Sequence, residues 1–229
     1  FIGALDALHA CAGVCGDADT AGWSTELATH MRADYAARYS DDDGLIRDTW
    51  SSASGIGASI SEHANLAAIR FGCVGDAQAQ RIIDRIFAHP DVVECQPFFM
   101  VVVLEALRRQ GRCDLALQLI RDRWGRMLDD GATSTYEEWT CNGSFRDGPW
   151  AGFLRSQSHA WSACAAAFLI RQLPGIEILE PGCERLRIRP YTGLDYVSTA
   201  PTPRGVLIVR VQDGAVAIES PPEISIERS

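Results

Sequence analysis

The sequence predicts a mainly α-helical fold, in which helices pair as hairpins and a short antiparallel β-region follows. Apolar residues recur every four positions early in the chain, as at Trp23, Leu27 and Met31. Near the C-terminus the period becomes two, because Leu186 and Ile188 alternate with arginines. Helices that all precede the strands argue against a parallel α/β sheet, so helical hairpins are expected to form the larger part of the fold.

The expected helices follow one another with alternately short and long connections. The first segment, FIGALDALHACAGVCG, already has helical periodicity and begins without Met, so we expect the chain to start in mid-protein. Ser61 is a plausible N-cap, Pro97 can open a helix, and Pro174 with Gly175 ends the last one. Helices are expected in 1–16, around 23–35, in 61–72, around 82–87, in about 98–109, in 115–128 and in 158–173.

The chain from residue 175 onward is expected to form the β-region. Strands are predicted at 185–189 and 223–227, and two more in 205–220 around a turn at Asp213 and Gly214. The predicted organisation is therefore a helical-hairpin domain over residues 1–174 and a β-sandwich domain over residues 175–229.

Composition excludes several classes of partner. The 229 residues carry a formal net charge of −9 and a pI of about 5.0, which makes nucleic acid and anionic membrane surfaces poor partners. The longest apolar run, 98–107, is interrupted by Glu105 and is shorter than the roughly 20 residues that span a bilayer. No targeting signal precedes the first helix, so the compartment stays open, with the cytoplasm favoured. The eight cysteines form no C-x-x-C pair and are expected to be small buried hydrophobes.

Residues on the long connections form a candidate site. If hairpins stack side by side, the long connections meet at one end, and functional residues gather on such loops. In GATSTYEEWT, the adjacent Glu137 and Glu138 follow Tyr136 and precede Trp139. Hydrolysis of a glycosidic bond needs carboxyl groups, and nearby rings can desolvate a carboxyl group and raise its pKa. The alternative is that both glutamates are ordinary solvated charges.

His159 and the metal-ligating residue types also have two interpretations each. A histidine at a helix start can donate to a sugar hydroxyl, but it can equally cap or pack internally. The sequence lacks H-E-x-x-H and paired-cysteine spacing, and Asp41 to Asp43 lack the spacing of a calcium loop. No phosphate-binding glycine loop with its Lys-Ser/Thr is present either. We therefore expect neither a metal nor a cofactor.

The order of several motifs resembles the C-terminal half of family 78 glycoside hydrolases, the α-L-rhamnosidases. The succession runs from SEHANLAAIRFG through GATSTYEEW, SHAWSA and LEPG to IRP and PTPRG, and it covers nearly the whole chain. The resemblance implies part of an (α/α)6 toroid of six helical hairpins, followed by the start of a β-sandwich. It also implies an inverting hydrolase that releases L-rhamnose from glycosides and needs no cofactor.

The resemblance assigns roles to particular residues. The family pattern GATTFWE-x-W falls on residues 131–139, which places the general base on Glu137, and the family's sugar-binding histidine falls on His159. Tyr136 stands where the family usually has Trp. Together with the residues that the long connections bring to the same end, this gives the rings and histidines expected to line the sugar pocket: Trp50, His63, Phe98, Tyr136, Trp139, His159 and Trp161.

The family's general acid lies in an acidic D-x-P-x-R-D/E type segment upstream of these helices, and this sequence contains no such segment. We therefore expect the missing N-terminal half of the same polypeptide to be the partner of this chain, and the chain alone to be inactive. Two other functions stay open. One is another six-hairpin exo-glycosidase or a sugar phosphorylase. The other is a non-catalytic carbohydrate-binding derivative.

Overall fold

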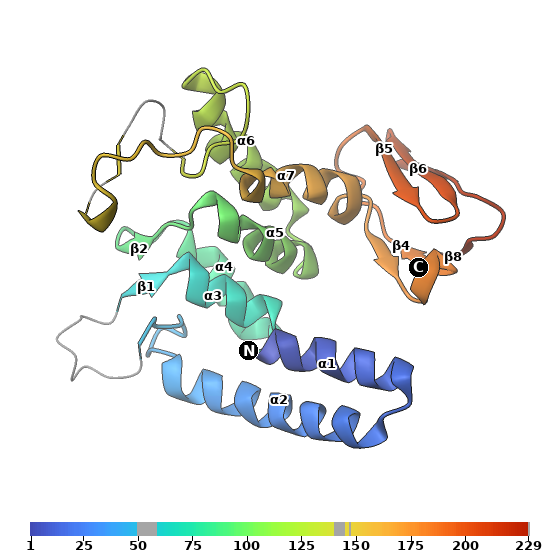
Figure 1. Ribbon diagram of the computed structural model, residues 1–229, viewed down its shortest axis with the longest axis horizontal. Helices are drawn as coiled ribbons and strands as arrows, with labels where there is room; N and C mark the ends of the chain where they lie inside the picture. Colours follow the sequence, from blue (N-terminus) through green and yellow to red (C-terminus); the bar gives the residue numbers. More distant parts are fainter. Residues whose placement is uncertain (50–58, 140–144, 147, 229) are drawn as a thin grey trace. The chain divides into compact units, whose positions relative to one another are not determined.

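A computed structural model of the protein describes residues 1–49, 59–139, 145–146 and 148–228. The chain divides into two compact units, Phe1–Cys95 and Gln96–Ser229. The first unit contains two pairs of helices and the second unit contains one, and the β-region of residues 176–228 belongs to the second unit (Figure 1).

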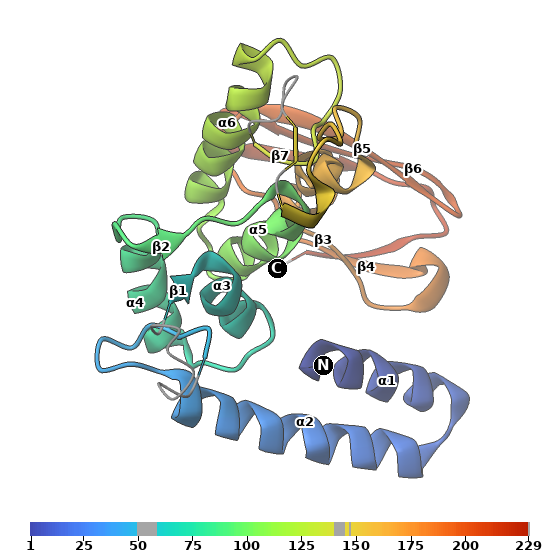
Figure 2. The ribbon, with the colours of Figure 1, turned by 60° about the vertical axis from the view of Figure 1, so that its left-hand side comes forward.

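The first unit opens with an antiparallel pair of helices, α1 (Ile2–Cys15) and α2 (Ala18–Tyr39) (Figure 2). The turn between them uses Gly16 at φ 73°, and the Asp17 side chain accepts from the Thr20 amide to cap α2. Ser24 and Ala28 are the buried residues of α2, while Trp23 is 54% exposed. The predicted apolar stripe of this helix is therefore wrong at Trp23, because the packed face lies one position further along the chain.

The second pair of the first unit is α3 (Glu62–Arg70) and α4 (Asp76–Ile86), preceded and followed by the parallel strands β1 (Ile60–Ser61) and β2 (Val92–Val93). Ser61 caps α3 by accepting from the Ala64 amide at 3.2 Å, which confirms the predicted N-cap. Asn65 is fully buried and bonds both the amide and the carbonyl of Ile46 at 2.8 Å, which fixes the preceding connection against α3.

The helical part of the second unit begins with a short 3₁₀ turn, η2 (Pro97–Phe99), that leads into α5 (Met100–Arg109) and then α6 (Cys113–Asp129). Pro97 stands at the start of η2, as predicted, because a helix start does not need its missing N–H. The buried face of α5 recurs at helical spacing and packs against α6.

The last predicted helix is present but irregular. It consists of the 3₁₀ turn η4 (Ala160–Ala163), the short α-helix α7 (Cys164–Ala167) and the π-turn η5 (Phe168–Gln172). The Leu173 amide donates to the Phe168 carbonyl at 2.8 Å, which is the i→i+5 bond of a π-turn. The remaining short helices of the described chain are η3 (Gly148–Trp150) and η6 (Pro181–Cys183).

The β-region contains two three-stranded sheets with one shared apolar core, formed around Leu186, Leu207 and Val209. One sheet has the order β3 (Ile176–Ile178), β4 (Arg185–Ile188), β8 (Ser225–Arg228), and the other is the meander β5 (Tyr196–Thr202), β6 (Gly205–Gln212), β7 (Ala215–Glu219).

The predicted antiparallel character holds for the meander and for β3 with β4, but β4 and β8 pair in parallel. The long crossover through the meander returns the chain to the same end of β4, which is what a parallel pair requires. The strands β3 and β5 were not predicted.

The β-region and the last helix are joined inside the second unit. Ser198 donates to the Ile170 carbonyl at 3.0 Å, and the Tyr196 hydroxyl donates to the Leu173 carbonyl at 3.2 Å. The Arg108 Nε donates to the Gln172 carbonyl at 2.7 Å. The boundary predicted at residue 174 thus lies inside a compact unit, and it stays a prediction.

No helix among the described residues is both long and apolar enough to cross a membrane. Cys73, Cys95 and Cys113 are buried as predicted, whereas Cys11 and Cys15 are exposed on α1, where the prediction of buried thiols is wrong. Cys141 lies outside the described residues.

Candidate active site

The segment that carries Glu137 begins at a tight turn after α6. Gly131 has φ 82°, its amide donates to the Leu128 carbonyl at 3.0 Å, and the Ala132 amide donates to the Met127 carbonyl at 2.9 Å. A left-handed residue at this position ends the helix and turns the chain away from its axis, which is why glycine suits it.

This segment then runs beside the segment that carries His159. The His159 amide donates to the Thr135 carbonyl at 2.8 Å, and the Thr135 hydroxyl donates to the His159 carbonyl at 2.9 Å. Two residues further on, the Glu137 amide donates to the Ser156 carbonyl at 2.9 Å. The backbone thus brings the two predicted functional residues, 22 positions apart, into one local structure.

The Glu137 side chain is 9% exposed and is held at one oxygen. Its Oε2 accepts from the Arg146 guanidinium and from the Ser156 amide, the latter at 3.2 Å. Burial raises the pKa of this carboxyl group, but the hydrogen bonds from Arg146 and Ser156 and the positive charges of Arg146 and His159 outweigh it, so the pKa is held below its ordinary value. The prediction that neighbouring rings raise this pKa is therefore wrong in its net direction.

A row of three rings lies next to the main chain of Glu137. The His159 and Trp161 ring centroids are 4.0 Å apart, and those of Trp161 and Phe98 are 5.4 Å apart. The Trp161 Nε1 donates to the Glu137 carbonyl at 3.4 Å. Trp161 and Phe98 are each 47% exposed, so both rings offer a surface to a ligand.

The other two rings of the motif are buried. Tyr136 is 4% and Trp139 is 3% exposed, and Trp139 makes an edge-to-face contact with Trp124 at 5.0 Å between centroids. These contacts anchor the segment on either side of Glu137 to α6. A direct contact of either ring with a sugar stays a prediction.

The second glutamate of the pair has its own cation. Arg155 Nε donates to Glu138 Oε2 at 2.7 Å, and the same guanidinium donates to the Phe145 carbonyl. The Glu138 side chain is 33% exposed, compared with 9% for Glu137. The two adjacent carboxylates therefore lie in different environments, and Glu137 is the more deeply buried.

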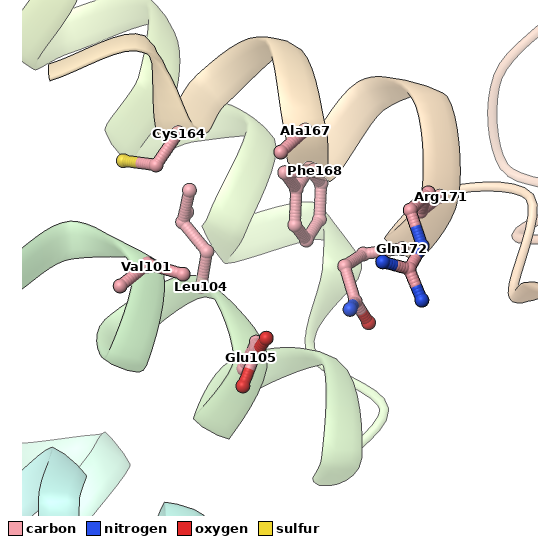
Figure 3. A pocket seen from close by; sticks show the side chains of 8 residues that line it. All are labelled: Val101, Leu104, Glu105, Cys164, Ala167, Phe168, Arg171 and Gln172. Carbon is pink, nitrogen blue, oxygen red and sulfur yellow. The ribbon is translucent and has the colours of Figure 1, made fainter. Parts of the chain in front are cut away.

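Two cavities of the second unit lie close to this site without including Glu137. A pocket of about 180 Å³ is enclosed by α5 and the last helix, with Cys164 and Val101 at one end and Glu105 and Gln172 at the other (Figure 3). A shallower cavity of about 320 Å³ is lined by the end of α6 and the backbone of residues 132–135.

The remaining predicted residues lie elsewhere. His63, the second residue of α3, belongs to the first unit, where burial lowers its pKa against the opposing charges of Glu62 and Asp48. Asp48 accepts from the hydroxyls of Ser59 and Ser61, at 2.7 and 2.5 Å. Trp50 lies outside the described residues. The structure brings together Phe98, Tyr136, Glu137, Trp139, His159 and Trp161.

Three residues of the site were not predicted: Arg146, Arg155 and Ser156. A signal was present for the first two, because they follow the two glutamates in the same connection with the opposite charge. Among the residues that the structure describes, no group of three or more His, Cys, Asp or Glu side chains could hold a metal ion.

Comparison with known families finds one match. Residues 1–173 match the family model described as the bacterial α-L-rhamnosidase six-hairpin glycosidase domain. No curated protein matches the sequence.

Solved structures share the fold over the whole chain. The GH78 family rhamnosidase of Bacillus sp. GL1 is 24% identical and has a TM-score of 0.83, with 100% of this chain and 25% of that chain covered. The α-L-rhamnosidase from Dictyoglumus thermophilum is 17% identical, with a TM-score of 0.78 over 99% of this chain and 26% of that one. The α-L-rhamnosidase of Streptomyces avermitilis, in complex with L-rhamnose, is 21% identical and has a TM-score of 0.72. The match covers 98% of this chain and 22% of that chain. The chain thus spans about a quarter of the length of these proteins.

Proposed function

Because the chain belongs to the family of bacterial α-L-rhamnosidase six-hairpin glycosidase domains, we propose that it is part of an inverting glycoside hydrolase that releases terminal L-rhamnose from glycosides. The observation that carries the proposal is the position of Glu137. Its carboxylate is buried, is held by Arg146 and feels the charge of His159, and its backbone carbonyl accepts from the ring of Trp161.

Glu137 is the proposed general base. It takes a proton from a water molecule, whose oxygen forms a bond with the anomeric carbon of the sugar. The bond from that carbon to the glycosidic oxygen breaks on the opposite face, and the leaving oxygen takes a proton from a general acid. In inverting enzymes the two carboxyl groups are about 6.5–9.5 Å apart. We expect the acid to come from a segment outside this sequence, in the N-terminal half of the same polypeptide.

His159 and the exposed rings are the proposed sugar contacts. The imidazole can donate to a sugar hydroxyl, and the faces of Trp161 and Phe98 can stack on the apolar face of a pyranose ring. Tyr136 and Trp139, on either side of Glu137, complete the proposed pocket within this unit, and the roles of His63 and Trp50 stay predictions from the sequence. We further propose the domain limits 1–174 and 175–229, which agree with the end of the family match at residue 173.

The decisive experiment replaces Glu137 by Gln in the longest polypeptide that the coding sequence specifies. Hydrolysis of an aryl α-L-rhamnoside is expected to fall by about 10²–10⁴-fold or more, because the variant cannot accept the proton from water. Glu219→Gln, on the exposed strand β7, is the matched control and should keep full activity. Proton NMR of the wild-type reaction should show β-L-rhamnose first, as inversion requires.

The same assay separates the other functions. A panel of aryl glycosides identifies another exo-glycosidase by a higher rate on a different sugar. A phosphorylase would depend on inorganic phosphate and release a sugar 1-phosphate. A carbohydrate-binding derivative would show no turnover, and Glu137→Gln would leave its binding of rhamnose unchanged in calorimetry.

A further inference from the structure

In the described part of the connection between Glu137 and His159, two glutamates pair with two arginines in matching order. Glu137 pairs with Arg146, and Glu138 pairs with Arg155. The proposed hydrolysis uses only one of these four charged groups, Glu137. The other three groups are Glu138, Arg146 and Arg155. Their roles depend on their contacts with Glu137 and with one another.

The two hydrogen bonds to the Glu137 carboxylate reach the same oxygen. Arg146 Nη2 and the Ser156 amide both donate to Oε2. In the part of the chain that the structure describes, no hydrogen bond reaches Oε1. Anchoring at a single oxygen fixes the orientation of the carboxylate and leaves its second oxygen available to a water molecule, which is the geometry that a general base needs.

Arg155 holds the segment that carries Arg146 through a hydrogen bond to the Phe145 carbonyl. Its guanidinium spans the Glu138 carboxylate and the Phe145 carbonyl. Phe145 also forms a β-bridge with Leu154, and the Arg146 amide donates to the Phe153 carbonyl at 2.7 Å. The carbonyl and the amide of the peptide group between Phe145 and Arg146 are thus both bonded to residues 153–155 of the connection.

Arg155 also keeps Glu138 from competing for Arg146. The two carboxylates are adjacent in the sequence, and both would attract the guanidinium of Arg146. Because Arg155 already donates to Glu138, Arg146 is left to the deeper carboxylate. Arginine suits the position of Arg155, since its planar fork reaches the Glu138 carboxylate and the Phe145 carbonyl at once.

We propose that Arg146 is a positioning residue that anchors Oε2 of Glu137 and leaves Oε1 to act on water, and that the Glu138–Arg155 pair keeps Arg146 in this position. The proposal rests on the proposed function of Glu137 as a base. The second glutamate of the motif then has a structural task and takes no part in proton transfer. Among the residues that the structure describes, the charged or titratable groups that act on the Glu137 carboxylate are Arg146 and His159, and the adjacent Glu138 is paired with Arg155.

The first test follows the titration of Glu137 itself by carbon NMR of a protein labelled at the glutamate side chains, with the signal assigned from Glu137→Gln. In Arg146→Gln the titration of Glu137 should move to higher pH, and Arg146→Lys should lie between this variant and the wild type. Arg155→Gln should also move it upward, because Glu138 then draws Arg146 away. Adding Glu138→Gln to Arg155→Gln should restore the wild-type position, which loss of packing alone would not do.

The second test measures activity in the longest encoded polypeptide. Arg146→Gln should lower kcat by about 10- to 100-fold with KM little changed, because the base is misplaced and sugar contacts are kept. The acid limb of the pH profile should move to higher pH in the same direction as the titration. Arg210→Gln, which removes an exposed ion pair with Glu219 on β6 and β7, is the control and should change neither measurement.

An unchanged Glu137 titration in a folded Arg146→Gln protein would overturn the proposal, and so would a failure of Glu138→Gln to reverse the effect of Arg155→Gln. The titration needs no turnover. If Glu137→Gln were fully active, the function proposed for Glu137 would fail, while the titration would still decide whether Arg146 anchors its carboxylate.

Discussion

Glu137 and Ser156 are joined by two hydrogen bonds in opposite directions. The Glu137 amide donates to the Ser156 carbonyl at 2.9 Å, and the Ser156 amide donates to Glu137 Oε2 at 3.2 Å. The backbone of one residue thus holds both the main chain and the side chain of the other. This arrangement ties the orientation of the carboxylate to the path of a connection that returns to it from 19 residues away.

The Ser156 amide can be removed without removing a charge. Ser156→Pro lacks the donor and should raise the pKa of Glu137, because the carboxylate loses one of the bonds that favour its charged form. Ser156→Ala keeps the amide and loses the bond from the hydroxyl to the Ser158 carbonyl, so the titration of Glu137 should match the wild type. Carbon NMR of the glutamate side chains measures the titration of Glu137 in both variants. Identical titration curves for the two variants would contradict the role of the amide.

The stability of the protein should depend on pH through Glu137. Its pKa is lower in the folded state than in the unfolded state, where about 4.3 is usual, so the folded state binds fewer protons between the two values. The stabilisation of the folded state by Glu137 is fully present above the pKa that this group has in the unfolded state. It is lost as the pH falls through the pKa that Glu137 has in the folded state. In urea titrations at pH 7 and about pH 3, the free energy of unfolding should fall more for the wild type than for Glu137→Gln. A parallel decline would rule this contribution out.

Gly175 should not tolerate a side chain. It has φ 65°, and a Cβ there would collide with the Arg189 carbonyl and the Arg108 guanidinium. Gly175→Ala should lower the free energy of unfolding by more than about 2 kcal/mol, because strain and overlap add. Gly22→Ala, in α2 with nothing within 4 Å, should instead stabilise by about 0.5–1 kcal/mol. Urea unfolding checks both, and a neutral Gly175→Ala would show that the backbone can relax.

Trp161 should contribute to substrate binding through its exposed face. Trp161→Ala should lower kcat/KM on an aryl α-L-rhamnoside by about two- to tenfold, since ring contacts of this kind contribute about 0.5–1.5 kcal/mol. Trp161→Phe should lower kcat/KM by less than Trp161→Ala does, because a ring can still lie between His159 and Phe98. Trp23→Ala, 54% exposed on α2, is the control. Loss of kcat/KM in that control as well would point to a general loss of folded protein.

Much of the fold and part of the site follow from the sequence because they are local. The Ser61 cap, the helix start at Pro97 and the hairpin of β6 and β7 around Asp213 and Gly214 depend on residues within a few positions of one another. The succession of motifs also predicted the family and the mainly α fold. Glu137 and His159 were predicted from that succession, and the backbone bond from His159 to Thr135 then brought them into one region.

By itself, therefore, the sequence determined most of the helices and the strands β4, β6, β7 and β8, because periodicity and caps act over a few residues. Only the tertiary structure decided that Arg146 and Ser156 hold Glu137, that Tyr136 and Trp139 are buried, and that β8 lies parallel to β4. These relationships join residues across connections of nine to 40 positions, and the path of such a connection depends on the packing of the whole unit. The same packing lowers the pKa of Glu137, because it places a cation beside the carboxyl group. Burial alone would have kept this group neutral up to a higher pH.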